Sequence, residues 1–202
     1  MRSFLAMGDS YTVGEGVAER ERWPAQLVRL LAERGIAISE PRIIAVTGWT
    51  TDELDAAIDR EAPGGPYELV SLLIGVNNQY RGRPLEEYRS EFRALLERAI
   101  RFAGGNAGRV LVLSIPDWGV TPFAEGRDRA RIAAEIDAFN AANRVETDRA
   151  GARYVDVTPI TRRAAGDPAL LAADGLHPSG AMYRDWAELA FPAAMAALEA
   201  PG

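Results

Sequence analysis

The sequence contains no cysteine and no lysine, and it has a single histidine. Without cysteine the chain can form no disulfide, no thiolate metal site and no cysteine nucleophile. Without lysine it can form neither a phosphate-binding loop of the GxxxxGK[ST] type nor a Schiff base with a carbonyl compound. Any chemistry that needs an imidazole must therefore use His177.

The sequence also lacks an apolar run long enough to span a bilayer, and its first seven residues are too short for a signal peptide. We therefore expect a cytoplasmic protein without membrane insertion. The net charge of -6 makes nucleic acid an unfavourable partner, because a phosphate backbone would be repelled. With 202 residues, 48% of them hydrophobic, the chain suits one domain over residues 1–202.

Short β-type runs alternate along the chain with longer helical patterns. The predicted strands cover residues 3–7, 42–46, 69–74, 109–115 and 153–157. The predicted helices cover residues 23–34, 51–60, 85–102, 127–149 and 179–198. Five such alternations predict an α/β fold, with a parallel sheet of about five strands and helices on both faces.

Polar residues and glycines follow each predicted strand. In an open α/β sheet, ligands bind outside the carboxyl ends of the strands. The segments at these positions are Gly8-Asp9-Ser10, Thr47-Gly48-Trp49, Gly75-Val76-Asn77-Asn78, Pro116-Asp117-Trp118 and, after a longer loop, Asp174-Gly175-Leu176-His177. The sequence therefore predicts a site built from these segments.

A serine and the single histidine are the candidates for nucleophilic chemistry at this edge. A serine hydroxyl is a weak nucleophile that needs a base within hydrogen-bond reach, and His177 is the one imidazole available to Ser10. Asp174 precedes the histidine by three residues, where it could accept the ring N–H and stabilise the imidazolium. Each of these residues alone has an ordinary structural interpretation, but together they indicate a serine hydrolase.

Such a reaction also needs hydrogen-bond donors for a developing oxyanion. Three donors are candidates: the backbone N–H groups of Ser10 and Gly48, and the side-chain amide of Asn77. Glycine at position 48 would allow a close approach of the backbone.

These segments together resemble the SGNH (GDSL-type) hydrolase family. The resemblance rests on Gly8-Asp9-Ser10, Gly48, Gly75-Val76-Asn77 and Asp174-Gly175-Leu176-His177, which span nearly the whole chain. It implies a three-layer α/β/α, flavodoxin-like fold that acts on esters without a metal or an organic cofactor. It implies Ser10 as nucleophile, Asp174 and His177 as its partners, and Ser10, Gly48 and Asn77 around the oxyanion.

The chain departs from the family pattern at Asn78, where many members carry aspartate. This difference removes a charge at position 78 and leaves the catalytic set intact. Ser10 also lies near the N-terminus and outside a GxSxG motif, which argues against the α/β-hydrolase fold.

Aromatic residues gather on the loops at the predicted site. We expect Tyr11, Trp49, Tyr80 and Trp118, together with Phe123, to form an apolar wall for the substrate. Because the insertions between elements are short, we expect an accessible site and small or medium acyl esters. The partner is then a small-molecule ester; the sequence does not indicate an oligomeric state.

Other functions are open at this point. The same residues would serve an acyltransferase, or an esterase for acylated carbohydrates, thioesters or lysophospholipids. A catalytically silent binding module would keep the fold, although the intact Ser10, Asp174 and His177 argue against it. A nucleotide-binding flavodoxin-like protein has less support, because Gly14-Glu15-Gly16 is not followed by the third glycine of a phosphate loop.

Overall fold

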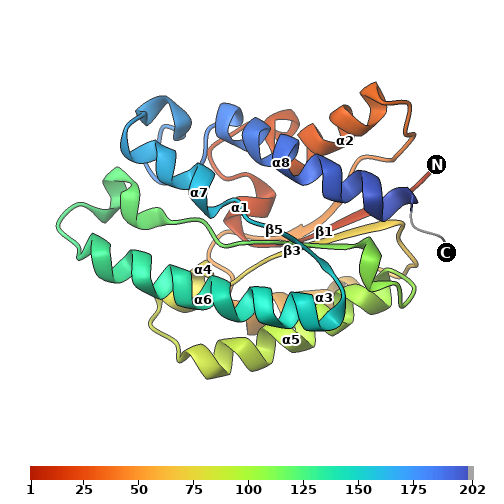
Figure 1. Ribbon diagram of the computed structural model, residues 1–202, viewed down its shortest axis with the longest axis horizontal. Coiled ribbons are helices and arrows are strands. Elements are labelled where there is room, and N and C mark those ends of the chain that lie inside the picture. The colour runs from red at the N-terminus through yellow and green to blue at the C-terminus, as the bar shows by residue number, and fades with distance from the viewer. Residues whose placement is uncertain (200–202) are drawn as a thin grey trace.

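A five-stranded parallel sheet forms the middle layer of the computed structural model, which describes residues 1–199 (Figure 1). The last three residues of the domain predicted over 1–202 lie outside the described residues. The strands are β1 (Phe4–Gly8), β2 (Arg42–Ala45), β3 (Leu69–Leu73), β4 (Val110–Leu113) and β5 (Arg153–Val155). Their order is β2-β1-β3-β4-β5, which is the flavodoxin-like order.

The three inner strands consist almost entirely of apolar residues. Every residue of β1, β3 and β4 is buried, including Ser71 in the middle of β3. A strand covered by helices on both faces has no solvent-facing side, so its sequence is a continuous apolar run. This explains why these strands could be predicted from the sequence.

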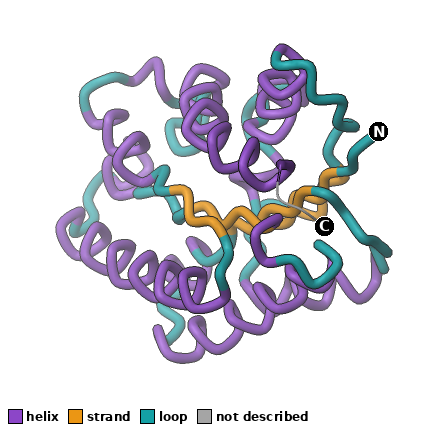
Figure 2. Tube along the Cα trace, turned by 45° about the vertical axis from the view of Figure 1, so that its right-hand side comes forward, coloured by secondary structure: helices purple, strands orange, loops and turns teal. Residues whose placement is uncertain are grey.

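Helices cover both faces of the sheet, which confirms the three-layer α/β/α prediction (Figures 1 and 2). The helices α2 (Trp23–Glu33) and α8 (Gly180–Glu199) pack together on one face. The other face carries α3 (Thr51–Glu61), α5 (Leu85–Phe102) and α6 (Arg129–Ala150). Within residues 1–199, no helix is both long enough and apolar enough to cross a lipid bilayer.

Three short helices were not predicted from the sequence. They are α1 (Ser10–Val13), α4 (Val76–Tyr80) and α7 (Thr158–Thr161). A helix of four or five residues shows too little of the 3.6-residue period to be recognised, and it depends on tertiary contacts for its stability. The strands β4 and β5 are also shorter than the predicted 109–115 and 153–157.

The sheet brings the loops after its central strands to one edge. Gly8 at the end of β1 is in register with Ala45 of β2 on one side and Leu73 of β3 on the other. Because all strands are parallel, the segments that follow these residues begin side by side. In the sheet, β2 lies on one side of β1, whereas β3 and the later strands lie on the other side. The strand order therefore reverses next to β1, and such a switch point is where ligands bind in this architecture.

Candidate active site

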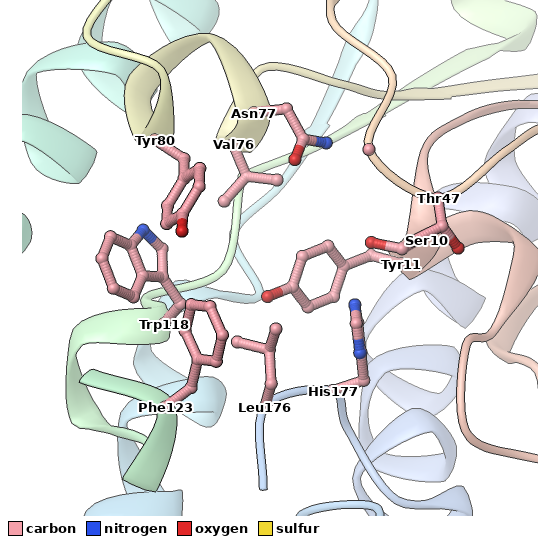
Figure 3. A pocket seen from close by; sticks show the side chains of 11 residues that line it. Ser10, Tyr11, Thr47, Val76, Asn77, Tyr80, Trp118, Phe123, Leu176 and His177 are labelled. Carbon is pink, nitrogen blue, oxygen red and sulfur yellow. The ribbon is translucent and has the colours of Figure 1, made fainter. Parts of the chain in front are cut away.

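A cavity of about 160 Å³ opens at this edge of the sheet (Figure 3). It is lined by Ser10, Tyr11, Thr47, Gly48, Val76, Asn77, Tyr80, Trp118, Phe123, Leu176 and His177. These residues come from the segments after β1, β2, β3 and β4 and from the loop before α8. The structure therefore brings Ser10, Gly48, Asn77 and His177, four of the residues singled out in the sequence, together at one cavity.

Ser10 is the first residue of α1, directly after the carboxyl end of β1. Asp9 caps this helix, because its Oδ1 accepts a hydrogen bond of 3.0 Å from the backbone N–H of Tyr11. The backbone N–H of Ser10 is among the first N–H groups of the helix, which have no partner within the helix itself. The cap therefore places both the hydroxyl and a backbone donor of Ser10 at the cavity.

Asp9 is completely buried beneath the site. Burial raises the pKa of its carboxyl from 3.8 to about 7, and the hydrogen bond from Tyr11 only partly offsets this effect. Its second oxygen, Oδ2, has no hydrogen-bond partner among residues 1–199. The helix cap thus uses one oxygen of a carboxyl that readily holds a proton near neutral pH.

Asp174 and His177 form a close pair at the cavity. Oδ2 of Asp174 lies 2.6 Å from Nδ1 of the imidazole. Oδ1 of the same carboxylate accepts the backbone N–H groups of Leu176 at 2.9 Å and His177 at 3.0 Å. Burial disfavours the charge of Asp174, but these hydrogen bonds outweigh it and lower the pKa of the carboxyl. An ionised Asp174 fixes the proton on Nδ1 and leaves Nε2 of His177 as the acceptor.

The free edge of the imidazole faces the serine side of the cavity. Figure 3 shows one ring nitrogen of His177 directed toward Tyr11 and Ser10. Within residues 1–199, the Ser10 hydroxyl makes no hydrogen bond with the ring, and such bonds are often loose in sites without substrate. The direction of the ring suits a base that acts on the serine side of the cavity.

Two further hydrogen-bond donors face the same cavity. Gly48 has a φ of 88°, and its backbone N–H has no hydrogen-bond partner among the described residues. The Nδ2 atom of Asn77 donates to the carbonyl of Trp49 at 2.9 Å, which uses one of its two hydrogens. The second amide hydrogen and the Gly48 N–H are available to a ligand.

A glycine in the β3–α4 turn positions Asn77. Gly75 has a φ of 130°, and a Cβ atom at this position would lie 2.5 Å from the ring and hydroxyl of Tyr88. Tyr88 is itself buried, and its hydroxyl donates to the carbonyl of Ile74. Only glycine allows the chain to turn this closely past Tyr88 into α4.

Four of the five predicted aromatic residues line the cavity: Tyr11, Tyr80, Trp118 and Phe123. The fifth, Trp49, does not line it. Its side chain packs against the hydrophobic core, and its carbonyl holds the Asn77 amide. The cavity therefore gives no support to the prediction that the Trp49 ring contacts substrate.

The sequence assigned no role to several residues that the structure places here. Thr47, Val76 and Leu176 line the cavity, and each is adjacent to a residue that the sequence singled out. Asn78 is buried and holds α4 to the start of α3: its Oδ1 accepts the Thr51 N–H at 3.1 Å, and its Nδ2 donates to the Thr51 hydroxyl at 2.7 Å. The sequence singled out Asn77 and marked Asn78 as a departure from the family pattern, but it gave no indication of the hydrogen bonds that Asn78 makes with Thr51.

The described part of the chain contains no group of three or more histidine, aspartate or glutamate side chains that could hold a metal ion.

Comparison with known families gives one match over most of the chain. Residues 6–184 match the model of the GDSL-like Lipase/Acylhydrolase family. None of the curated protein sequences matches the chain. The matched segment includes Ser10, Gly48, Asn77, Asp174 and His177.

Several solved structures have the same fold. An acetylxylan esterase from Geobacillus stearothermophilus aligns with a TM-score of 0.70 and 19% identity, covering 99% of this chain and 95% of that chain. A lipase/acylhydrolase from Enterococcus faecalis aligns with a TM-score of 0.71 and 21% identity, covering 95% and 94%. A psychrotrophic esterase from Pseudoalteromonas sp. aligns with a TM-score of 0.68 and 16% identity, covering 96% of each chain. At these identities the similarity establishes the shared fold.

Proposed function

The chain belongs to the GDSL-like lipase/acylhydrolase family, and from this premise we propose that it is a serine esterase acting on small or medium acyl esters. The observation that carries the proposal is the Asp174–His177 pair, joined at 2.6 Å, which places the imidazole in the same cavity as Ser10. The nucleophile is the hydroxyl of Ser10, and the reaction passes through an acyl-enzyme.

In the first half of the reaction, Oγ of Ser10 attacks the ester carbonyl carbon while Nε2 of His177 takes the hydroxyl proton. The carbonyl oxygen becomes an oxyanion, and Asp174 stabilises the imidazolium that has formed. Collapse of the tetrahedral intermediate breaks the bond to the alcohol, which leaves with the proton from His177. The acyl group is then bound to Ser10.

In the second half, water attacks the acyl carbon and gives its proton to Nε2 of His177. The second tetrahedral intermediate collapses, the proton returns to Oγ of Ser10, and the carboxylic acid leaves. The enzyme regains its starting state with one water consumed. Asp174 stays ionised throughout, in keeping with the lowered pKa of its carboxyl.

The oxyanion of both intermediates binds three donors: the backbone N–H groups of Ser10 and Gly48 and the side-chain amide of Asn77. The N–H of Gly48, which has no hydrogen-bond partner in the described part of the chain, and the second hydrogen of the Asn77 amide support this assignment. Donors held in place before the reaction stabilise charge that develops only in the transition state, so they accelerate the chemical step.

The size and lining of the cavity support small or medium acyl groups. Its volume is about 160 Å³, and apolar side chains such as Val76, Leu176 and Trp118 form much of its wall. The binding of an acyl chain there would rest on apolar contact, and the few polar groups would orient the carbonyl.

The test is hydrolysis of p-nitrophenyl esters of increasing acyl length by the wild type, Ser10→Ala and His177→Ala. We expect both substitutions to lower kcat by at least about 10³-fold, because the nucleophile and its base act as one unit. Ser90→Ala, an exposed serine on α5, is the matched control and should leave kcat unchanged. Full activity in Ser10→Ala would refute the proposal.

A further inference from the structure

Three aromatic side chains form one wall of the cavity, on the side away from Ser10 and His177 (Figure 3). We call Tyr80, Trp118 and Phe123 the aromatic wall. The ring centroids of Tyr80 and Trp118 are 5.3 Å apart, those of Trp118 and Phe123 are 5.9 Å apart, and those of Tyr80 and Phe123 are 6.1 Å apart. Each ring therefore contacts the other two at distances typical of favourable aromatic pairs.

The aromatic wall is fixed at its base and open at its rim. Nε1 of Trp118 donates to Oε1 of Gln79 at 2.8 Å, and Nε2 of Gln79 donates to Glu135 on α6 at 2.8 Å. Trp118 is only 4% exposed, whereas Tyr80 is 44% and Phe123 is 43% exposed. A substrate arm lying along the wall would pass from a rigid indole to two solvent-facing rings.

The guanidinium of Arg127 lies over all three rings of the aromatic wall. The guanidinium carbon of Arg127 lies 5.2 Å from the centroid of Tyr80, 5.3 Å from that of Trp118 and 5.6 Å from that of Phe123. One of its nitrogens donates to the Tyr80 hydroxyl at 3.2 Å. These contacts hold the guanidinium against the aromatic wall by cation–π attraction.

Arg127 has no carboxylate partner within residues 1–199, although Glu125 and Asp128 are close in sequence. By contrast, Arg81 beside Gly48 is paired with Glu53 and bound to the Gly48 carbonyl. Arg127 thus keeps a positive charge and several N–H donors that no acidic side chain of the described chain neutralises.

We propose that Arg127 is a specificity-determining residue that selects esters whose acyl or alcohol arm ends in a carboxylate; this inference rests on the proposed esterase function. The arm lies along the aromatic wall, and its carboxylate binds the guanidinium, whose planar array of donors matches two carboxylate oxygens. A quaternary ammonium group, which three rings could otherwise surround, is disfavoured because the guanidinium already occupies that position and repels it.

The test uses two pairs of esters that differ mainly in one carboxylate. The acyl arm is tested with p-nitrophenyl hemiglutarate against p-nitrophenyl valerate, and the alcohol arm with 4-carboxyphenyl butyrate against phenyl butyrate. We expect Arg127→Met to lower the ratio of kcat/KM for the anionic over the neutral ester by roughly three- to tenfold in at least one pair, since the guanidinium is partly exposed. The pair that responds identifies the arm that reaches Arg127.

The matched control removes a guanidinium that makes the same kind of contact with a ring elsewhere in the molecule. Arg144→Met removes a guanidinium that lies 5.4 Å from the ring centroid of Tyr154, a ring that, unlike the three rings beneath Arg127, does not line the cavity. It should leave both ratios unchanged. The preference of the wild type for the anionic ester should also weaken when salt is raised, because salt screens an exposed charge.

Ratios that Arg127→Met leaves unchanged in both pairs would overturn the inference while the esterase function stands. If the wild type cleaves none of these esters, the proposed function fails, and titration calorimetry with glutaramate and its uncharged counterpart valeramide then tests Arg127 alone. Weaker binding of glutaramate but not of valeramide by Arg127→Met would support the inference. Glutaramate that binds the variant as tightly as the wild type would overturn it.

Discussion

At the scale of single residues, the site depends on side chains that hydrogen bonds hold in one orientation. Asp174 uses both carboxylate oxygens, one for the imidazole of His177 and the other for two backbone N–H groups. The carboxylate cannot turn away from the ring without losing all three contacts. The imidazole is therefore held in one orientation and one tautomer before a substrate arrives, which is what a general base requires.

The adjacent residues Asn77 and Asn78 allow a catalytic role to be separated from a structural role by comparing their alanine variants. We expect Asn77→Ala to lower kcat on a p-nitrophenyl ester by about 10²–10³-fold, because it removes a donor to the oxyanion. Its effect on thermal stability should be small, since the amide makes one hydrogen bond at the cavity, to Trp49. Steady-state kinetics and a thermal melt measure both effects.

Asn78→Ala is the matched control, and we expect the opposite result. It removes two buried hydrogen bonds to Thr51 and should lower the free energy of unfolding by about 1–3 kcal/mol. Below its melting temperature, the variant should keep most of its kcat. A normal kcat in Asn77→Ala would exclude this side chain from the oxyanion site.

At the scale of an element, the β1–α1 junction combines a helix cap with a buried carboxyl. The Asp9 carboxylate fixes the first turn of α1, and with it Ser10. Because Asp9 is buried, its carboxylate is shielded from water and accepts a single hydrogen bond, from the Tyr11 N–H. Burial raises the pKa of this carboxyl to about 7. The folded protein therefore binds a proton that the unfolded chain releases near pH 4.

This proton gives the fold a specific pH dependence. Because the pKa of Asp9 is higher in the folded protein, its contribution to stability is complete below pH 3.8 and is lost as the pH rises to about 7. Asp9→Asn keeps a neutral side chain at every pH. Relative to this variant, the wild type should lose free energy of unfolding between these values, by at most about 4 kcal/mol.

Urea unfolding of the wild type and Asp9→Asn at intervals from pH 4 to pH 8 measures this difference. The gap in free energy of unfolding between the two proteins should widen from pH 4 to about pH 7 and level off toward pH 8. A gap that stays constant with pH would show that Asp9 does not take up a proton on folding.

At the scale of the whole molecule, the architecture could be predicted from the sequence because two long-range rules act together. Apolar runs such as 69–74 and 109–115 indicate strands buried on both faces, and the helices between them force the strands to be parallel. Parallel strands in turn gather their following loops at one edge. The meeting of Ser10, Gly48, Asn77 and His177 at one cavity follows from that arrangement.

The parts that could not be predicted depend on packing that has no local signature. The helices α1 and α4 are too short to show periodicity, yet they carry Ser10 and Asn77. Trp49 and Thr47 flank the same glycine, and only the structure shows that the threonine, not the tryptophan, lines the cavity. The sequence likewise could not show that Arg127 lies over the aromatic wall, because that contact brings the end of α4 against the loop of residues 118–127.

The central claim is that Ser10 is a nucleophile activated by His177, and covalent labelling with a fluorophosphonate tests it most directly. Oγ of Ser10 would bond to phosphorus with loss of fluoride, and peptide mapping by mass spectrometry would locate the adduct. We predict one adduct, on Ser10, that is absent in Ser10→Ala and forms much more slowly in His177→Ala. A folded wild-type protein that takes up no label, or Ser10→Ala that is labelled as fast as the wild type, would contradict the account.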